Sequence, residues 1–293
     1  MRPKVLIGYD GSPQGEDALG LGRRLSQVLD ARPILTTVIA HPRQGVEESE
    51  FDDAVAKFCE PHFAKAREHL DGLEVIAKPV VNDSPAAAIY ELADWEKPTL
   101  IAIGSTRHGR TGRVLVGTLG ASLLSGIQCS VAVAPRGYAD RASGLGRIGV
   151  AVDGSSESWR ALSAGAYLAQ RANAALQVLS VMEPPHYVLG GLLSPLGPQE
   201  YREFKEEEWE RVYEDARSRV PESVPMEPLL LHGEPAEVLA EGASDVDLLL
   251  LGSRGYGPVK GTLLGSVSAR VMAAAPCPVI VTPRGAGSRP LVP

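Results

Sequence analysis

The sequence predicts an α/β protein made of two similar domains in tandem, each a five-stranded parallel sheet with helices on both faces. Three observations support this fold class. The segment Val5–Ser12 recurs as Ile148–Ser155. The stretch 104–137 recurs at 252–285, with 12 of 34 residues identical. Short apolar runs alternate with helical stretches along both halves, which is typical of strands buried on both faces of a doubly wound sheet.

The repeat also sets the expected domain bounds. We expect a first domain over residues 1–138, a linker over 139–144, a second domain over 145–285 and a flexible tail over 286–293. Each domain then has about 140 residues, which is a usual domain size. A repeat this long indicates duplication of a whole domain, because solenoid repeats are much shorter.

Within the second half, apolar runs predict the strands and amphipathic stretches predict the helices. The expected strands are 148–152, 176–182, 226–231, 248–251 and 279–281, and the expected helices are 155–171, 201–220, 234–242 and 263–275. The first half has the same order, with later strands at 34–39, 75–81, 100–103 and 131–133. The inward face of the helix over 201–220 is expected to carry Phe204, Trp209, Val212 and Tyr213.

Composition excludes several function classes. The formal net charge of −7 argues against a protein that binds nucleic acid through a basic surface, and the 5% aromatic content argues against stacking platforms for single strands. No apolar run approaches the roughly 20 residues that span a bilayer. The three cysteines, Cys59, Cys129 and Cys277, are too few and too far apart for a disulfide framework. We therefore expect a cytoplasmic protein without nucleic-acid or membrane partners.

The loop after the first strand of each half carries the triplet Asp-Gly-Ser, at 10–12 and at 153–155. Its aspartate can accept a hydrogen bond from a sugar hydroxyl or an adenine amine. The same triplet also serves as a turn followed by a helix N-cap. A single copy favours the turn, whereas its presence beside a glycine-rich loop in both halves favours a ligand site.

The loop after the fourth strand of the second half indicates a ligand site more strongly than the Asp-Gly-Ser triplet does. It runs from Gly252 through Gly255 to Gly265-Ser266. Glycines let backbone N–H groups approach phosphate oxygens, and the helix opening at Gly265-Ser266 offers a positive dipole end to an anion. The loop matches neither the Walker A pattern nor the GxGxxG fingerprint of dinucleotide-binding domains. The alternative is a glycine-rich turn that only joins a strand to a helix.

The spacing Gly252-x2-Gly255-x9-Gly265-Ser266 resembles the ATP-binding branch of the universal stress protein family. The resemblance covers essentially the whole chain as two family domains, including Asp-Gly-Ser after the first strand and the ending Cys277–Arg284. It implies flavodoxin-like or Rossmann-like domains, similar to the adenine nucleotide alpha hydrolase fold. It also implies binding of ATP, AMP or ADP with Mg²⁺ or Mn²⁺, and a role in stress signalling. The last strands of the two domains are then expected to pair, so that the two domains form an internal pseudo-dimer. A further homodimer of two whole chains is left open.

The resemblance implies one set of binding residues in each half. The expected second-half residues are Ala151, Asp153, Val181, Gly252, Gly255, Gly265, Ser266 and Val267. The expected first-half residues are Gly8, Asp10, Val38, Gly104, Arg107, Gly109, Gly117 and Thr118.

The first half departs from the family pattern at one position. Arg107 stands where the second half has Gly255. If the backbone there requires a positive φ, an arginine costs about 1 kcal/mol or more. Its side chain can instead reach a phosphate, as can Arg110 and Arg113. The two halves are therefore not expected to hold equivalent sites, and the second half is the stronger ATP candidate.

Other chemistry has little support in the sequence. None of the six histidines forms a metal-binding pattern, so a divalent ion is expected only with the nucleotide. No general base or arginine–lysine clamp stands beside the glycine-rich loop, which favours a regulatory ATP-binding protein with at most weak hydrolysis. The alternatives are a slow ATPase or nucleotidyl transferase, and a nucleotide-free interaction module. The sequence does not identify a signalling partner.

Overall fold

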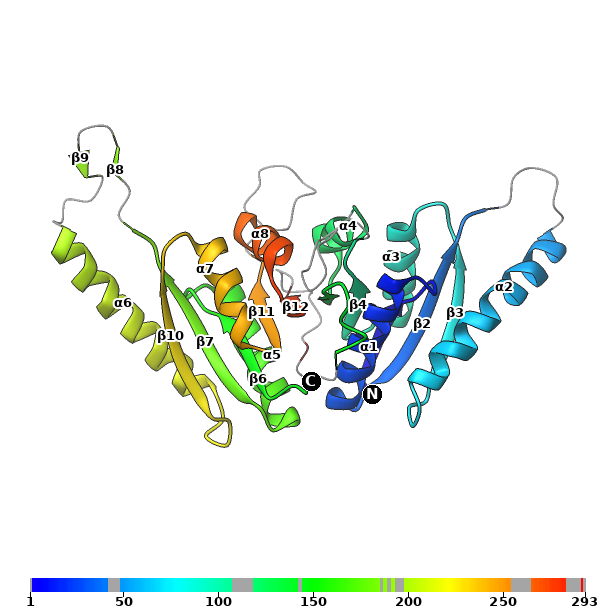
Figure 1. Ribbon diagram of the computed structural model, residues 1–293, viewed down its shortest axis with the longest axis horizontal. Coiled ribbons are helices and arrows are strands. Elements are labelled where there is room, and N and C mark those ends of the chain that lie inside the picture. Colours follow the sequence, from blue (N-terminus) through cyan, green and yellow to red (C-terminus); the bar gives the residue numbers. More distant parts are fainter. Residues whose placement is uncertain are drawn as a thin grey trace.

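The computed structural model describes residues 2–41, 48–106, 118–141, 144–184, 187–188, 191–192, 198–253, 265–282 and 291. Ten strands form one continuous sheet in the order β10-β7-β6-β11-β12-β5-β4-β1-β2-β3 (Figure 1). The first-half strands are β1 (Lys4–Gly8), β2 (Arg32–Ile39), β3 (Ile76–Val81), β4 (Leu100–Gly104) and β5 (Ser130–Ala134). The second-half strands are β6 (Arg147–Ala151), β7 (Ala175–Met182), β10 (Met226–His232), β11 (Leu248–Gly252) and β12 (Val279–Thr282). A separate short hairpin joins β8 (Tyr187–Val188) to β9 (Gly191–Leu192).

Helices cover both faces of the sheet. The first half has α1 (Pro13–Leu29), α2 (Glu48–His69), α3 (Pro85–Glu96) and α4 (Thr118–Gly126). The second half has α5 (Ser156–Ala172), α6 (Pro198–Arg219), α7 (Pro235–Gly242), a 3₁₀ turn (Ala243–Asp245) and α8 (Ser266–Ala274). The elements in the two halves follow the same order, so the predicted duplication and the Rossmann-like α/β fold are confirmed.

The two halves join through their last strands. β12 pairs antiparallel with β5, placing Val279 opposite Val133 and Val281 opposite Val131, whereas all other pairs in the large sheet are parallel. This is the pairing expected of these strands. Arg171 Nε in the second half also donates to the carbonyl of Val28 in the first, at 2.6 Å.

The core has two layers, one on each face of the sheet. One apolar cluster packs the sheet against α1, α2, α5 and α6, and continues from the first half into the second. The other packs the opposite face against α3, α4, α7 and α8. The central strands are buried on both faces, which explains their uninterrupted apolar runs. All three cysteines are buried and free, and burial raises the pKa of the Cys277 thiol to about 12.

The predicted inward face of α6 is wrong at one residue. Phe204 is 48% exposed, whereas Ala216 and Val220 near the end of the helix are buried. The cause is the position of the helix, which flares outward from the edge strand β10 toward its first turns (Figure 1). Val212 is partly buried against the core, as expected.

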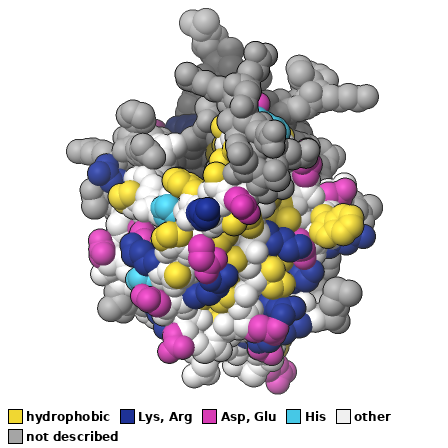
Figure 2. Space-filling view, turned by 90° about the vertical axis from the view of Figure 1, so that its right-hand side faces the viewer, with side chains coloured by type: hydrophobic (Ala, Val, Ile, Leu, Met, Phe, Trp, Pro, Cys, Tyr) yellow, Lys and Arg dark blue, Asp and Glu magenta, His cyan; other side chains and the backbone are white. Residues whose placement is uncertain are grey.

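The outer face of the first half carries charges of both signs interspersed with apolar side chains (Figure 2). Exposed ion pairs join Arg67 to Glu60 and Arg32 to Glu74. Such pairs contribute little to stability because water screens them.

A better-buried ion pair network lies near the amino ends of the first-half strands. Glu96 is 8% exposed and accepts hydrogen bonds from Lys4 Nζ, at 2.7 Å, and from Lys78 Nζ. The hydrogen bonds from these two ammonium groups hold the pKa of the Glu96 carboxyl below its usual value. The carboxylate therefore stabilises the folded state above its unfolded pKa, and that contribution is lost as pH falls through the lower folded pKa.

Glu96→Gln is accordingly expected to lower the free energy of unfolding by about 2 kcal/mol at pH 7, because charge-assisted hydrogen bonds contribute that much. The difference from the unchanged protein should shrink below about pH 4, near the unfolded pKa of glutamate. Urea unfolding at several pH values measures it. Glu60→Gln, at an exposed ion pair, is the control and should change stability by less than about 0.5 kcal/mol.

Candidate functional site

Each half of the sheet has a point where the strand order reverses. The chain runs from β1 outward to β2 and β3, then returns to the other side of β1 as β4 and β5. The second half repeats this arrangement, with its reversal between β6 and β11. In open parallel sheets, ligands bind beyond the carboxyl ends of the strands at such a point. The structure has a pocket at both places.

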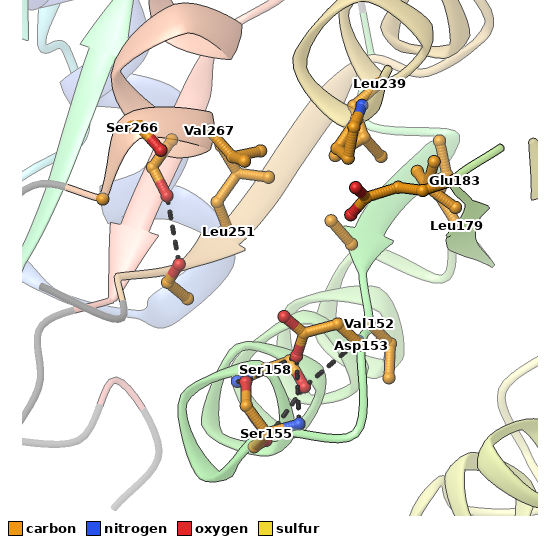
Figure 3. A pocket seen from close by; sticks show the side chains of 16 residues that line it. Val152, Asp153, Ser155, Ser158, Leu179, Glu183, Leu239, Leu251, Ser266 and Val267 are labelled. Carbon is orange, nitrogen blue, oxygen red and sulfur yellow. Dashed lines mark hydrogen bonds between the residues drawn. The ribbon is translucent and has the colours of Figure 1, made fainter. Parts of the chain in front are cut away.

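The second-half pocket has a volume of about 270 Å³ and lies between the ends of β6, β7 and β11 and the starts of α5, α7 and α8. Its walls combine an apolar side with scattered polar groups (Figure 3). The apolar side consists of Val152, Leu179, Val181, Leu239, Leu251 and Val267. The polar groups are Asp153, Ser155, Ser158, Glu183, Ser266 and Ser268. This composition is typical of small-molecule sites, which are mostly apolar with a few polar groups that orient the ligand.

The Asp-Gly-Ser triplet forms a tight turn at the floor of this pocket. Gly154 has φ +78°, a conformation that side chains disfavour. The Asp153 Oδ1 atom accepts from the backbone N–H of Ser155 at 3.0 Å, and the Ser155 hydroxyl caps α5 by accepting from Ser158 N at 3.2 Å. Asp153 also lines the pocket. The triplet therefore serves as turn and helix cap, and it places a carboxylate at the candidate site.

The first half repeats this turn. Gly11 has φ +73°, Asp10 Oδ1 accepts from Ser12 N at 3.0 Å, and Ser12 caps α1 at Gly15 N. Asp10 lines the first-half pocket.

The first glycine of each glycine-rich loop has a packing role that the sequence did not reveal. A Cβ on Gly252 would lie 2.5 Å from the carbonyl carbon of Glu157 and 2.8 Å from Ser158 N, in the first turn of α5. A Cβ on Gly104 would lie 2.0 Å from the carbonyl oxygen of Gln14, in α1. These glycines let the first helix of each half approach the sheet, whatever they contribute to a ligand.

The start of α8 faces the second-half pocket without a side-chain cap. Gly265 is the N-cap residue, with φ −63° and ψ 148°, and no side chain accepts a hydrogen bond from the first turn. In contrast, side chains of Ser12, Ser84, Ser155 and Glu234 cap α1, α3, α5 and α7. The N–H groups at the start of a helix attract anions, and Ser266 and Val267 line the pocket at this point (Figure 3).

The structure brings together seven of the eight residues predicted for the second-half site. Ala151, Asp153, Val181, Gly252, Gly265, Ser266 and Val267 all line the pocket. Gly255 lies outside the described residues. In the first half, Gly8, Asp10, Val38 and Gly104 line the corresponding pocket. Arg107, Gly109 and Gly117 lie outside the described residues, and Thr118 begins α4.

Glu183 is the most informative pocket residue that the sequence reasoning missed. It follows β7 directly, two residues after Val181, and Figure 3 shows its carboxylate directed into the pocket between Leu239 and Val152. The sequence feature that could have predicted Glu183 as a site residue is an acidic side chain directly after a predicted strand. The corresponding first-half position, two residues after Val38, is Ala40. Leu239 and Pro235 were also missed, because only the folded chain brings α7 against β7 at the edge of the pocket.

Within the described ranges, no group of three or more histidine, cysteine, aspartate or glutamate side chains comes together as a metal site. None of the helices in those ranges is long and apolar enough to cross a membrane.

Comparison with known proteins identifies the family. The model of the universal stress protein family matches residues 1–135 and again residues 144–283. The chain belongs to the universal stress protein family. Both matches include the Asp-Gly-Ser turn and the glycine-rich loop, so the family resemblance rests on both halves.

Some relatives of this universal stress protein align with nearly the whole chain, and others align with about one half of it. A universal stress protein of Mycobacterium tuberculosis is 24% identical over 299 residues, which cover 95% of this chain and 99% of the relative. A single-domain universal stress protein of Thermus aquaticus is 36% identical over 137 residues, or 45% of this chain and 94% of the relative.

Solved structures share the fold over nearly the full length. A universal stress protein from Archaeoglobus fulgidus superposes with a TM-score of 0.66 at 20% identity, covering 97% of each chain. A second from Pseudomonas aeruginosa gives 0.63 at 18% identity, covering 96% of this chain and 92% of the other.

Proposed function

We propose that this universal stress protein binds an adenine nucleotide, ATP in the first place, in its second-half pocket, and that the nucleotide controls its conformation or its binding of a partner. The observation that carries the proposal is the pocket itself. It lies at the strand-order reversal, and it gathers seven predicted residues around an uncapped helix start. AMP and ADP are the alternative ligands.

The two sides of the pocket suggest how the nucleotide lies. The phosphates would face the N–H groups at the start of α8, with the Ser266 hydroxyl beside them. The base would rest against Leu179, Val181 and Leu239 on the opposite side. Asp153, between these two sides, would accept a hydrogen bond from the ribose. Mg²⁺ or Mn²⁺ would enter with the nucleotide, bound mostly by phosphates and water.

A regulatory role agrees with the chemistry of the described lining. Its two carboxylates are Asp153, whose Oδ1 is engaged in the turn, and Glu183, which lies on the side away from α8. Neither is placed to activate a water molecule at the phosphates. A ligand acts as a regulator when it binds two conformations with different affinity. We place this role in the cytoplasm, in stress signalling with a partner of unknown identity, and a homodimer is compatible with it.

Mass spectrometry of nucleotide that co-purifies with the protein tests the proposal. We expect ATP, ADP or AMP at a substantial fraction of one equivalent per chain or more. Absence of any adenine nucleotide, together with no binding on addition of ATP, would favour a nucleotide-free interaction module. Release of phosphate well above background at saturating ATP would instead favour the enzyme alternative.

Glu183 tests the orientation of the nucleotide. If the base lies beside it, Glu183→Ala removes an acceptor for the adenine amine and should weaken ATP binding about three- to tenfold, the effect of one hydrogen bond. Glu183→Gln keeps a carbonyl acceptor and should restore most of the affinity. Isothermal titration calorimetry measures both. Tighter binding by Glu183→Ala would contradict this orientation, since it would place the carboxylate near the phosphates.

A further inference from the structure

The second half of the sheet has another cavity, on the opposite side of β7 from the proposed nucleotide pocket. Its volume is about 180 Å³, and it lies between α6 and the carboxyl-terminal parts of β6, β7 and β10. Successive side chains of a strand point to opposite faces of the sheet. Ser180 and Met182 therefore face α6 and line this cavity, whereas Leu179 packs on the side of α7.

The first half has a bulkier side chain where this cavity begins. Tyr9 and Val152 both follow the first strand of their half directly, and both donate a backbone N–H to the neighbouring strand. The N–H of Tyr9 donates to the carbonyl of Thr36 at 2.9 Å, and that of Val152 donates to Leu179 at 2.8 Å. Tyr9 is 1% exposed, and its hydroxyl donates to Glu16 on α1 at 2.9 Å. The tyrosine ring therefore occupies space on this face of the sheet that the smaller valine leaves open in the second half.

The helix over the cavity differs from its counterpart as well. Both α2 and α6 have 22 residues, and the fully buried Ala66 of α2 corresponds to the fully buried Ala216 of α6. In this alignment Lys205 takes the place of Val55, which is buried. The second half thus has a charged group at a position that is apolar in the first half. The cavity is a property of the second half and not of the fold that the two halves share.

An ion pair lies at the mouth of the cavity. Lys205 Nζ donates to Glu208 Oε2 at 2.5 Å, and the two side chains are 34% and 50% exposed. The hydrogen bond to Glu208 raises the pKa of the Lys205 ammonium, so the lysine keeps its charge. Asp153 adds a second carboxylate to the lining. The cavity therefore presents one cationic group and two anionic groups to a ligand.

The interior of the cavity is apolar and of limited size. It is lined by Val152, Met182, Trp209, Val212 and Leu230. The Trp209 ring stacks on Tyr213 with 6.0 Å between the ring centroids, which holds it as a flat wall. An apolar cavity of about 150 Å³ holds one benzene ring. A volume of about 180 Å³ therefore suits a single ring or a branched aliphatic chain.

We propose that this cavity binds an apolar α-amino acid, with its side chain in the interior and its charged groups at the ion pair. The carboxylate of the ligand would pair with Lys205, and its ammonium group with Glu208 and Asp153. A zwitterion fits this arrangement because it presents both signs of charge on adjacent groups. An ion of a single charge would oppose one member of the pair with a like charge. The size of the interior favours phenylalanine or leucine.

Isothermal titration calorimetry with L-phenylalanine and with L-leucine, without added nucleotide, tests the proposal. One equivalent of at least one of them should bind per chain. Two analogues of phenylalanine separate the charges: 2-phenylethylamine lacks the carboxylate, and 3-phenylpropionate lacks the ammonium group. Each analogue should bind at least about tenfold more weakly, since it loses a hydrogen bond between charged groups.

Variants on α6 place the ligand in the cavity, and neither altered residue lines the nucleotide pocket. Lys205→Met keeps an apolar stem but removes the ammonium group, and it should weaken the amino acid about tenfold or more. Val212→Phe should fill the interior and abolish binding; Val212 is only partly buried, so the melting temperature should stay close to that of the unchanged protein. Arg211→Met is the matched control. Arg211 is 70% exposed, pairs with Glu207 and does not line the cavity, so its removal should leave the affinity unchanged.

Three results would overturn the inference. The first is failure of both amino acids to bind. The second is equally tight binding of either single-charge analogue, which would make the cavity a site for organic ions. The third is unchanged affinity in Lys205→Met, which would place the amino acid elsewhere on the protein. None of these measurements uses a nucleotide, so their outcome is distinct from that of the test of ATP binding.

Discussion

Gly104→Ala is expected to destabilise the protein by about 2 to 3 kcal/mol, the upper range for overpacking a close-packed site. The added Cβ would lie 2.0 Å from the carbonyl oxygen of Gln14 and 2.7 Å from its carbonyl carbon. Both atoms belong to the backbone of α1, which packs on β1 and β4, so no flexible side chain can move aside. The helix must shift away from the sheet, and the floor of the first-half pocket shifts with it.

Gly8→Ala provides a matched control. Gly8 lines the same pocket, but a Cβ there would approach its neighbours no closer than 3.7 Å, an ordinary contact. Urea unfolding of the two variants should therefore differ by about 2 kcal/mol, with Gly8→Ala close to the unchanged protein. Equal stabilities would show that α1 can move without cost, and the packing role assigned to Gly104 would be wrong.

Gly265→Glu is expected to reduce the adenine nucleotide bound in the second-half pocket by at least half. The new carboxylate would occupy the uncapped start of α8, where the N–H groups would otherwise face the phosphates. A negative charge there competes for these donors and repels the ligand. The loss should appear as lower nucleotide content by mass spectrometry and weaker ATP binding by calorimetry.

Gly144→Glu controls for the added charge and size. Gly144 lies in the stretch between the two halves, and a Cβ there would meet nothing within 4 Å. Its nucleotide content should match that of the unchanged protein. Unchanged nucleotide content in Gly265→Glu would contradict the dominance of the second-half pocket.

The sequence predicted the fold well because the information for it is local and repeated. The apolar runs of β6 and β11 are uninterrupted, since both strands are buried on both faces. The observed strand ends lie within two residues of the predicted ones, and several coincide with them. The duplicated Asp-Gly-Ser turn could also be predicted from the sequence. Glycine is favoured where φ is positive, and serine is favoured as a helix cap directly after a strand.

The features that the sequence did not reveal depend on contacts between distant segments. Gly252 looked like a phosphate-loop glycine, and only its distance from α5 shows that it also clears space for a helix. The helical periodicity of the sequence predicted that Phe204 faces the core, but α6 diverges from the sheet at that end and leaves Phe204 exposed.

A crystal structure of the protein with ATP tests most directly whether the second-half pocket is a nucleotide site. We predict density for the nucleotide between the ends of β6 and β11, with phosphates at the start of α8 and the base against Leu179 and Val181. A crystal saturated with ATP in which this pocket stays empty, or in which the phosphates lie beside Glu183, would contradict the account.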